Sequence, residues 1–292
     1  MTEKSLAEGI DLTQVEALIR LAIKEDIGTG DLTSTSVLSR RAKARGTFMV
    51  KEDGRIAGLP LLPVVYRNIN KNVKVMPLLE DGRMVVGGTP VAHVTGPAIA
   101  ILSGERIALN FLQRLSGIAT LAARFVEEVS GTNVEIFDTR KTMPGWRCLE
   151  KYAVRIGGGR NHRMGLFDHV LIKDNHLRLS AYQPIAEAVN RARQKCRPGT
   201  VVEVEAESLA QVEDALAAGA DIIMLDNMAP ELMTKAVKII RAAPVVPRIE
   251  ASGGVSLATA RRIAQTGVDW ISVGELTHSA PALDIGLDLD PL

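Results

Sequence analysis

The chain has 292 residues, of which 46% are hydrophobic and 3% aromatic, and its formal net charge is +1. This length allows one large or two ordinary domains with real hydrophobic cores, and the composition does not suggest disorder. The scarcity of aromatic side chains and the near-neutral charge argue against a nucleic-acid-binding protein.

The cellular setting follows from what the sequence lacks. No run is long enough for a membrane span, and MTEKSLAEGI does not resemble a secretory leader. Two cysteines, Cys148 and Cys196, are too few for a disulfide framework or a four-thiolate zinc site, and they fit a reducing compartment. We therefore expect a cytoplasmic protein that does not associate with membranes.

The N-terminal part, residues 1–115, predicts a small α/β domain. Residues 12–27 carry apolar side chains at helical spacing. Short strands bounded by Gly or Pro are predicted for residues 44–54, 72–82 and 89–97. Residues 97–130 predict helix, with breaks expected at Gly104 and Gly117.

From about residue 116 onward, short apolar runs alternate with helical patterns. The six runs are VEIFD, DHVLIKD, TVVEVEAE, DIIMLDN, PRIEASGG and DWISVGE. Strand followed by helix, repeated in this way, is typical of parallel βαβ units, and strands apolar at nearly every position are covered on both faces. A doubly wound sheet would carry a GxGxxG after its first strand, which is missing here. We therefore expect an incomplete, about six-stranded parallel β/α barrel over residues 116–292, with the C-terminal tail packing back on the N-terminal domain.

Charged or flexible residues stand at the end of each predicted strand. In barrels these carboxyl ends meet at one mouth, which holds the active site. A charge can simply mark where a strand emerges into water, but six strand ends in succession favour a common site. In chain order the residues are Asp138 with Arg140 and Lys141, then Lys173, Glu205, Asp226, Ser252-Gly253-Gly254 and Gly274.

The residue types sort along the chain and indicate a class of ligand. The early strand ends supply cations, which bind anions through charge-assisted hydrogen bonds. The middle two supply Glu205 and Asp226, which could hold Mg²⁺ or favour a positive charge developing between them. The last two supply Gly-rich turns, whose backbone N–H groups bind phosphate. The sequence predicts a phosphorylated, strongly anionic small-molecule substrate, together with a metal ion.

Many segments, in order and over nearly the whole chain, resemble quinolinate phosphoribosyltransferases, the carboxylating nicotinate-nucleotide pyrophosphorylases. The matching text is EDIGTGDLTS, ERIALNFLQRLSGIAT, DTRKTMPG, LEKYAV, GGGRNHRMGL, LIKDNH, VEVEAESL, GADIIMLDN, EASGG and DWISVGELTHS. Departures are small: Trp146 and Cys148 fill variable places, and Glu207 stands where Asn or Asp is frequent.

This resemblance implies that the protein transfers phosphoribose from phosphoribosyl pyrophosphate to quinolinate, with Mg²⁺, giving nicotinate mononucleotide, pyrophosphate and CO₂ for NAD biosynthesis. It also implies a homodimer in which Arg106 completes the neighbouring subunit's site. Catalytic roles fall to Lys141, Lys173, Glu205 and Asp226, the last two also facing the metal. The implied substrate-binding set is Arg106, Thr139, Arg140, Lys141, His162, Arg163, Lys173, Glu205, Asp226, Ser252, Gly253, Gly254 and Gly274.

Other interpretations stay open at this stage. A related phosphoribosyltransferase with another acceptor, or a non-catalytic phosphate-binding barrel, would share much of this pattern. Lys151 and Arg155 are expected to be solvated, and His169 and His176 to be structural.

Overall fold

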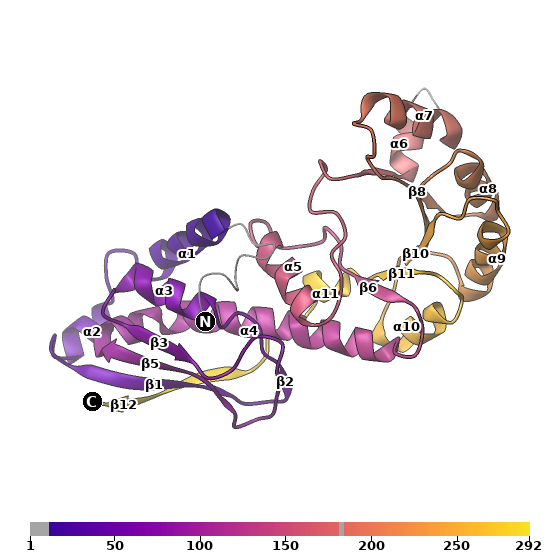
Figure 1. Ribbon diagram of the computed structural model, residues 1–292. Helices are drawn as coiled ribbons and strands as arrows, with labels where there is room; N and C mark the ends of the chain where they lie inside the picture. Colours follow the sequence, from indigo (N-terminus) through magenta and orange to yellow (C-terminus); the bar gives the residue numbers. More distant parts are fainter. Residues whose placement is uncertain (1–11, 181–183) are drawn as a thin grey trace. The chain divides into compact units, whose positions relative to one another are not determined.

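The computed structural model describes residues 12–180 and 184–292, and the chain divides into two compact units (Figure 1). Unit 1 comprises the chain up to Ala123, Thr142–Gly158 and Thr277–Leu292, and unit 2 comprises Arg124–Lys141 and Gly159–Leu276. The stretch MTEKSLAEGI, considered above as a leader, lies outside the described residues.

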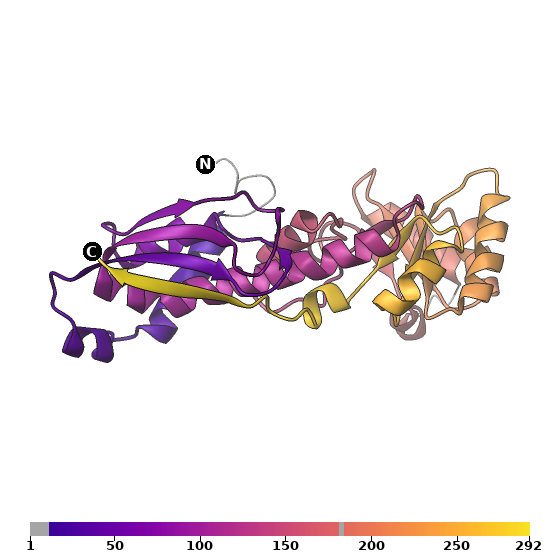
Figure 2. The same ribbon diagram turned by 90° about the horizontal axis from the view of Figure 1, so that it is seen from below.

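Unit 1 is built on a four-stranded antiparallel sheet in the order β12-β1-β5-β3. Every second residue of β1 is buried, because one face of the sheet packs on a core that includes Phe48 and Tyr66. β12, from the C-terminal tail, pairs with β1 along Ala44–Val50 (Figure 2). Its elements are α1 (Leu12–Asp26), α2 (Leu32–Val37), β1 (Lys43–Val50), β2 (Gly54–Arg55), α3 (Leu61–Ile69), β3 (Lys74–Pro77), β4 (Met84–Val85), β5 (Pro90–Pro97), α5 (Arg147–Ile156) and β12 (Ile285–Pro291). α11 (Glu275–His278) begins in unit 2 and ends in unit 1.

The helix predicted for residues 97–130 is confirmed, but the breaks expected at Gly104 and Gly117 are wrong. α4 runs without interruption over Ala98–Glu128. Both glycines instead allow close packing: a Cβ at Gly104 would lie 2.8 Å from the Tyr66 ring, and one at Gly117 would lie 1.8 Å from the Pro281 carbonyl oxygen.

Gly117→Ala should therefore destabilise the protein although alanine favours helix. The new methyl group meets backbone that cannot move aside, so we expect a loss of about 3 kcal/mol in unfolding free energy. Urea denaturation checks this, with Asn110→Ala on the exposed face of α4 as the matched control. A Gly117→Ala protein as stable as that control would contradict the packing described here.

The expectation that Lys151 is solvated is wrong. Its side chain is fully buried in α5, next to Glu150, which is also fully buried and accepts two hydrogen bonds from Arg114, at 2.7 and 3.2 Å. Glu150 of α5 therefore forms an ion pair with Arg114 of α4 within unit 1. Arg155 is half-buried, with its guanidinium 6.0 Å from the centre of the Tyr152 ring.

Unit 2 contains a six-stranded parallel sheet in the order β6-β11-β10-β9-β8-β7 (Figure 1). The predicted fold class is confirmed, because each strand lies within one of the six predicted runs and helices follow the strands. The barrel is open, since β6 and β7 form the two edges of the sheet. The elements are β6 (Glu135–Phe137), β7 (Val170–Ile172), α6 (Asp174–Leu179), α7 (Ile185–Lys195), β8 (Val202–Ala206), α8 (Leu209–Ala217), β9 (Ile222–Asp226), α9 (Pro230–Arg241), β10 (Arg248–Ser252), α10 (Leu257–Ala264) and β11 (Trp270–Ser272).

The interior of this sheet is more polar than the predicted apolar strands suggest. β8 is buried along its whole length, yet two of its five residues, Glu203 and Glu205, are carboxylates on the same face of the strand. β10 adds Glu250, which is also fully buried. The side chains facing the inside of the open barrel therefore supply charge as well as packing.

Two further features concern membrane-spanning helices and the state of the cysteines. Among the helices of the described ranges, none is long and apolar enough to cross a membrane. Cys148 and Cys196 are free thiols.

Candidate active site

The predicted strand-end residues of unit 2 lie at the carboxyl edge of the parallel sheet. Glu205 and Asp226 stand at or next to the ends of the adjacent strands β8 and β9, and Ser252 is the last residue of β10. Lys173 directly follows β7. The segment Asp138–Lys141 follows β6, and Gly274 lies two residues after β11. Parallel strands place these ends on one side of the sheet, as the sequence predicts.

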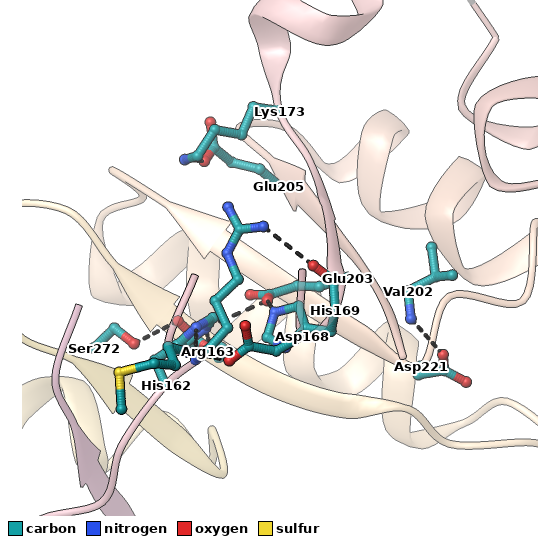
Figure 3. A network of polar contacts seen from close by, with 12 residues as sticks. His162, Arg163, Asp168, His169, Lys173, Val202, Glu203, Glu205, Asp221 and Ser272 are labelled. Carbon is teal, nitrogen blue, oxygen red and sulfur yellow. Dashed lines mark hydrogen bonds and ion pairs between the residues drawn. The ribbon is translucent and has the colours of Figure 1, made fainter. Parts of the chain in front are cut away.

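Glu205 and Asp226 form a carboxylate pair at this edge. Glu205 is 8% exposed, and its Oε2 contacts the Lys173 ammonium (Figure 3). Burial raises the pKa of Glu205, Lys173 opposes this, and Asp226 raises it further by repulsion. The two carboxylates are thus close enough to repel each other, so a cation placed between them would be stabilised. Their oxygen atoms suit Mg²⁺, which prefers carboxylate and water ligands.

The turn after β10 has the shape of an anion-binding cradle. Gly253 has φ +92°, and a Cβ there would lie 2.2 Å from Asn227 Oδ1, so only glycine fits. The N–H of Asn227 donates to the Ser252 carbonyl at 2.9 Å, which joins the ends of β9 and β10. The turn leads into α10, whose N-terminal N–H groups point toward the same edge of the sheet. Ser252, Gly253 and Gly254 therefore offer backbone donors to a phosphate.

Cationic side chains lie in two loops, the one after β6, with Arg140 and Lys141, and the one before β7, with Arg163. Arg163 Nη1 donates to the His169 carbonyl at 3.1 Å. Burial lowers the pKa of Arg163 and repulsion from Arg140 lowers it further, so these two guanidinium groups lie near each other. Lys141 is exposed, and its N–H donates to Thr139 Oγ1 at 3.0 Å. These two loops thus bring cationic side chains to the end of the sheet where the sequence predicts an anionic ligand.

Asp138 anchors this loop from the end of β6. Its buried carboxylate accepts the His162 N–H at 2.9 Å and the Asn161 side-chain amide at 2.6 Å. Reasoning from sequence placed Asp138 at the strand end but gave it no task. The structure shows that it holds the loop carrying His162 and Arg163.

Three further polar residues escaped sequence reasoning as members of the site. Glu203 Oε2 lies 3.3 Å from His162 Nε2 and 3.0 Å from His169 Nε2, and Glu250 Oε2 lies 3.2 Å from His162 Nε2. Ser272 Oγ donates to the other Glu250 oxygen at 2.5 Å. The available signal was a glutamate in the interior of each of two strands predicted to be buried, Glu203 in VEVEA and Glu250 in RIEAS.

His162, His169 and Glu203 also have the spacing of a metal site, since one ligand atom from each lies within 4.8 Å of the others. Two imidazoles favour a transition metal rather than Mg²⁺. The Mg²⁺ expected from the sequence would therefore suit Glu205 and Asp226 better than this cluster.

The surroundings of His162 predict a shifted titration. Burial alone lowers its pKa, but Glu203 and Glu250 outweigh burial and raise the pKa to about 10. Its Nδ1 accepts the Arg163 N–H at 2.9 Å, which opposes protonation of that nitrogen and leaves Nε2 to carry the proton facing the carboxylates. A fully protonated His162 ring loses the hydrogen bond that its Nδ1 accepts from the Arg163 N–H, and attraction by the two carboxylates outweighs that loss.

NMR titration of the His162 ring should therefore give a midpoint well above the usual value of about 6.5. The folded-state pKa exceeds the unfolded one, so the resulting stabilisation is complete below the unfolded pKa and is lost as the pH rises through about 10. A midpoint near 6.5 would show that the carboxylates do not stabilise the charged ring.

Arg106 differs from the other predicted residues, because it belongs to unit 1. It lies on α4 with its side chain exposed.

The chain resembles known proteins over nearly its whole length. Residues 31–116 match the family model described as the quinolinate phosphoribosyl transferase N-terminal domain, and residues 118–288 match the C-terminal domain of the same family. The chain is 43% identical over 276 residues to the probable nicotinate-nucleotide pyrophosphorylase (carboxylating) of Bacillus subtilis, with 94% of this chain and 93% of that protein covered.

Two further proteins extend the comparison. The corresponding probable enzyme of Synechocystis is 42% identical over 267 residues, covering 91% of this chain and 90% of that one. The crystal structure of NadC from Streptococcus pyogenes superposes with a TM-score of 0.91 at 38% identity, over 97% of this chain and 99% of that chain. With both family models matched in order and similar relatives aligned nearly end to end, the chain belongs to the quinolinate phosphoribosyltransferase family.

Proposed function

We infer that the chain is a carboxylating nicotinate-nucleotide pyrophosphorylase, which joins quinolinate to phosphoribosyl pyrophosphate in NAD biosynthesis. The products are nicotinate mononucleotide, pyrophosphate and CO₂. The observation that carries this inference is the carboxyl edge of the unit 2 sheet, where cations, a carboxylate pair and a glycine cradle meet in a chain of this family.

Both substrates are anions, which accounts for the cations. Quinolinate has two carboxylates, and we assign them to Arg140, His162 and Arg163, with Thr139 as a further donor. Lys141 and Lys173 hold the diphosphate, whose negative charge grows as it leaves. The 5-phosphate lies at Ser252, Gly253, Gly254 and Gly274, where backbone N–H groups can bind it.

The carboxylate pair acts on the sugar. Loss of pyrophosphate leaves a cationic, oxocarbenium-like ribose, and Glu205 and Asp226 stabilise that charge where it develops. Mg²⁺ bound with phosphoribosyl pyrophosphate supplies charge neutralisation to the leaving group, and these two carboxylates would hold it. The Lys173 ammonium, already on Glu205, favours the ionised form of that carboxylate and offsets part of the effect of burial.

Bond formation and decarboxylation follow from the substrate's own chemistry. The pyridine nitrogen of quinolinate attacks the ribose carbon and becomes positively charged. The carboxylate next to that nitrogen is then lost as CO₂, because the cationic ring stabilises the electron pair that the breaking bond leaves on the ring carbon. That carbon then takes up a proton from water, which gives nicotinate mononucleotide. The protein's task is to hold the remaining carboxylate, so no covalent enzyme intermediate is needed.

We further propose a homodimer in which Arg106 of one subunit completes the site of the other. The support is the family resemblance of the GERIALN segment and the exposed position of Arg106 on α4. We place the protein in the cytoplasm, since both cysteines are free thiols, as is usual in a reducing compartment.

An acceptor comparison tests this function. With phosphoribosyl pyrophosphate and Mg²⁺ present, quinolinate should be converted to nicotinate mononucleotide, and nicotinate hardly at all. Nicotinate has one carboxylate, so it would leave part of the cation set of Arg140, His162 and Arg163 unpaired, at a cost of about 1–3 kcal/mol or more. Mass spectrometry of the nucleotide products makes the measurement.

Three other results would contradict this function. Comparable turnover of nicotinate, or a product formed only with some other acceptor, would indicate a related phosphoribosyltransferase. Binding of phosphoribosyl pyrophosphate without turnover of any acceptor would indicate a phosphate-binding barrel.

A further inference from the structure

Glu203 and Glu250 are two fully buried carboxylates inside unit 2 to which the proposed reaction assigns no task. Glu203 lies on β8 two residues before Glu205, on the same face of the strand, and therefore deeper in the barrel. Glu250 lies on β10, two residues before Ser252. Both thus sit one layer beneath the proposed substrate site.

Their oxygen atoms converge on one histidine ring. Glu203 Oε2 and Glu250 Oε2 lie 3.3 and 3.2 Å from His162 Nε2, so the ring faces carboxylates from two separate strands. Figure 3 labels His162 and Glu203 of this cluster. The Phe137 ring stands edge-on to it, with centroids 6.4 Å apart. The backbone is fixed independently, by Asp138 through the His162 N–H.

Glu203 is also linked to Arg163, one of the two arginines assigned to quinolinate. Glu203 Oε2 lies 3.0 Å from His169 Nε2, and the His169 carbonyl accepts from Arg163 Nη1 at 3.1 Å. Glu203 is therefore connected to two of the three side chains assigned to quinolinate: to His162 directly, and to Arg163 through His169.

The electrostatic cost of burying Glu203 and Glu250 indicates that these carboxylates have a function. A buried carboxylate is costly unless it is paired, and an apolar side chain of similar size would often stabilise the barrel as well or better. Near a site for a dianion, an unbalanced carboxylate would also repel the substrate. The negative charge of Glu203 is balanced there by His162, His169 and Arg163. The same contacts restrict the orientation of these three residues.

We propose that Glu203 and Glu250 are positioning residues, which fix the His162 ring and, through it and through His169, place the Arg163 guanidinium in the orientation that binds the acceptor's carboxylates. This inference rests on the proposed function. According to this proposal, Glu203 and Glu250 increase the affinity for quinolinate although they do not contact it.

The first experiment compares Michaelis constants in Glu203→Gln and Glu250→Gln, with Glu231→Gln as the matched control. Glu231 is an exposed glutamate of the same unit that pairs with Arg262. We expect KM for quinolinate to rise about ten-fold or more in Glu203→Gln, as for loss of a charge-assisted contact. KM for phosphoribosyl pyrophosphate should change much less. Glu250→Gln should act in the same direction but more weakly, because burial raises the pKa of Glu250 and glutamine imitates its protonated form.

A double-mutant cycle shows whether Glu203 acts through His162. If it does, Glu203→Gln combined with His162→Asn should raise KM for quinolinate little more than His162→Asn alone. A thermal unfolding scan of each variant identifies the folded ones, and Glu250→Gln serves in the cycle if Glu203→Gln does not fold.

Several results would overturn the proposal. These are unchanged KM for quinolinate in both folded variants, equal effects on both substrates, or effects that add fully to that of His162→Asn. Zinc bound at one ion per chain in the purified protein, and lost in Glu203→Gln, would show instead that the cluster is a metal site. Each of these leaves wild-type turnover of quinolinate intact, whereas failure of the proposed function would abolish it.

Discussion

Asp226→Asn is expected to lower kcat about 100- to 1,000-fold, the scale seen when one transition-state contact is removed. The substitution keeps the shape of the side chain, including the contact in which Asn227 Nδ2 lies 2.6 Å from the carboxylate. It removes a negative charge that matters most when the ribose becomes cationic. Quinolinate affinity, measured by equilibrium titration, should change little, because the assigned acceptor contacts lie elsewhere.

The control for this prediction is Asp214→Asn, an exposed aspartate on α8 in the same unit. It should leave kcat unchanged. If Asp226→Asn instead abolished quinolinate binding while kcat at saturation held, the assignment of Asp226 to the ribose would be wrong.

Activity is expected to return when two inactive variants, Arg106→Ala and Asp226→Ala, are mixed under conditions that let subunits exchange. If Arg106 completes the partner's site, a hybrid dimer carries one site with both defects and one with neither. About half of randomly formed dimers are hybrids, so activity should recover toward about a quarter of the wild-type value. The measurement is turnover of quinolinate after mixing.

Mass spectrometry of differently tagged chains would confirm the exchange. If exchange is complete and no activity returns, Arg106 acts within its own chain or has no part in the reaction. Mixing Arg106→Ala with wild-type chains gives the reference for a dimer with one intact and one defective site.

The strands of unit 2 could be predicted because their signal is local. Each is a short apolar run, and each ends where a charged residue or glycine appears, so Lys173, Glu205 and Asp226 could be placed from the text alone. Parallel topology then brings them to one edge without further information.

The long-range features could not be predicted in the same way. Gly117 looks like a helix break in sequence, but what decides its role is the carbonyl of Pro281, which is distant along the chain. Lys151 looks solvated, yet α5 buries it in unit 1 with residues from far upstream. The roles of Gly117 and Lys151 depend on residues that pack against them from distant parts of the chain, which a local sequence pattern cannot identify.

The contacts among Glu203, Glu250, His162 and His169 could not be predicted from local sequence patterns either. Glu203 and Glu250 are visible as glutamates in apolar strands, but nothing near either one indicates His162 as the shared contact. His169, expected to be structural, has its ring on Glu203 and its carbonyl on Arg163. A charged residue inside a predicted buried strand is therefore a signal in its own right, even when its partner cannot be named.

The most direct test of the account is release of labelled CO₂ from quinolinate that carries ¹³C in the carboxylate next to the ring nitrogen. The account makes decarboxylation depend on the positive charge that the ring gains by attacking the ribose. Label should therefore be released only when phosphoribosyl pyrophosphate and Mg²⁺ are present, in an amount equal to the nicotinate mononucleotide formed. Release of label without phosphoribosyl pyrophosphate, or nucleotide formed with the label retained, would contradict it.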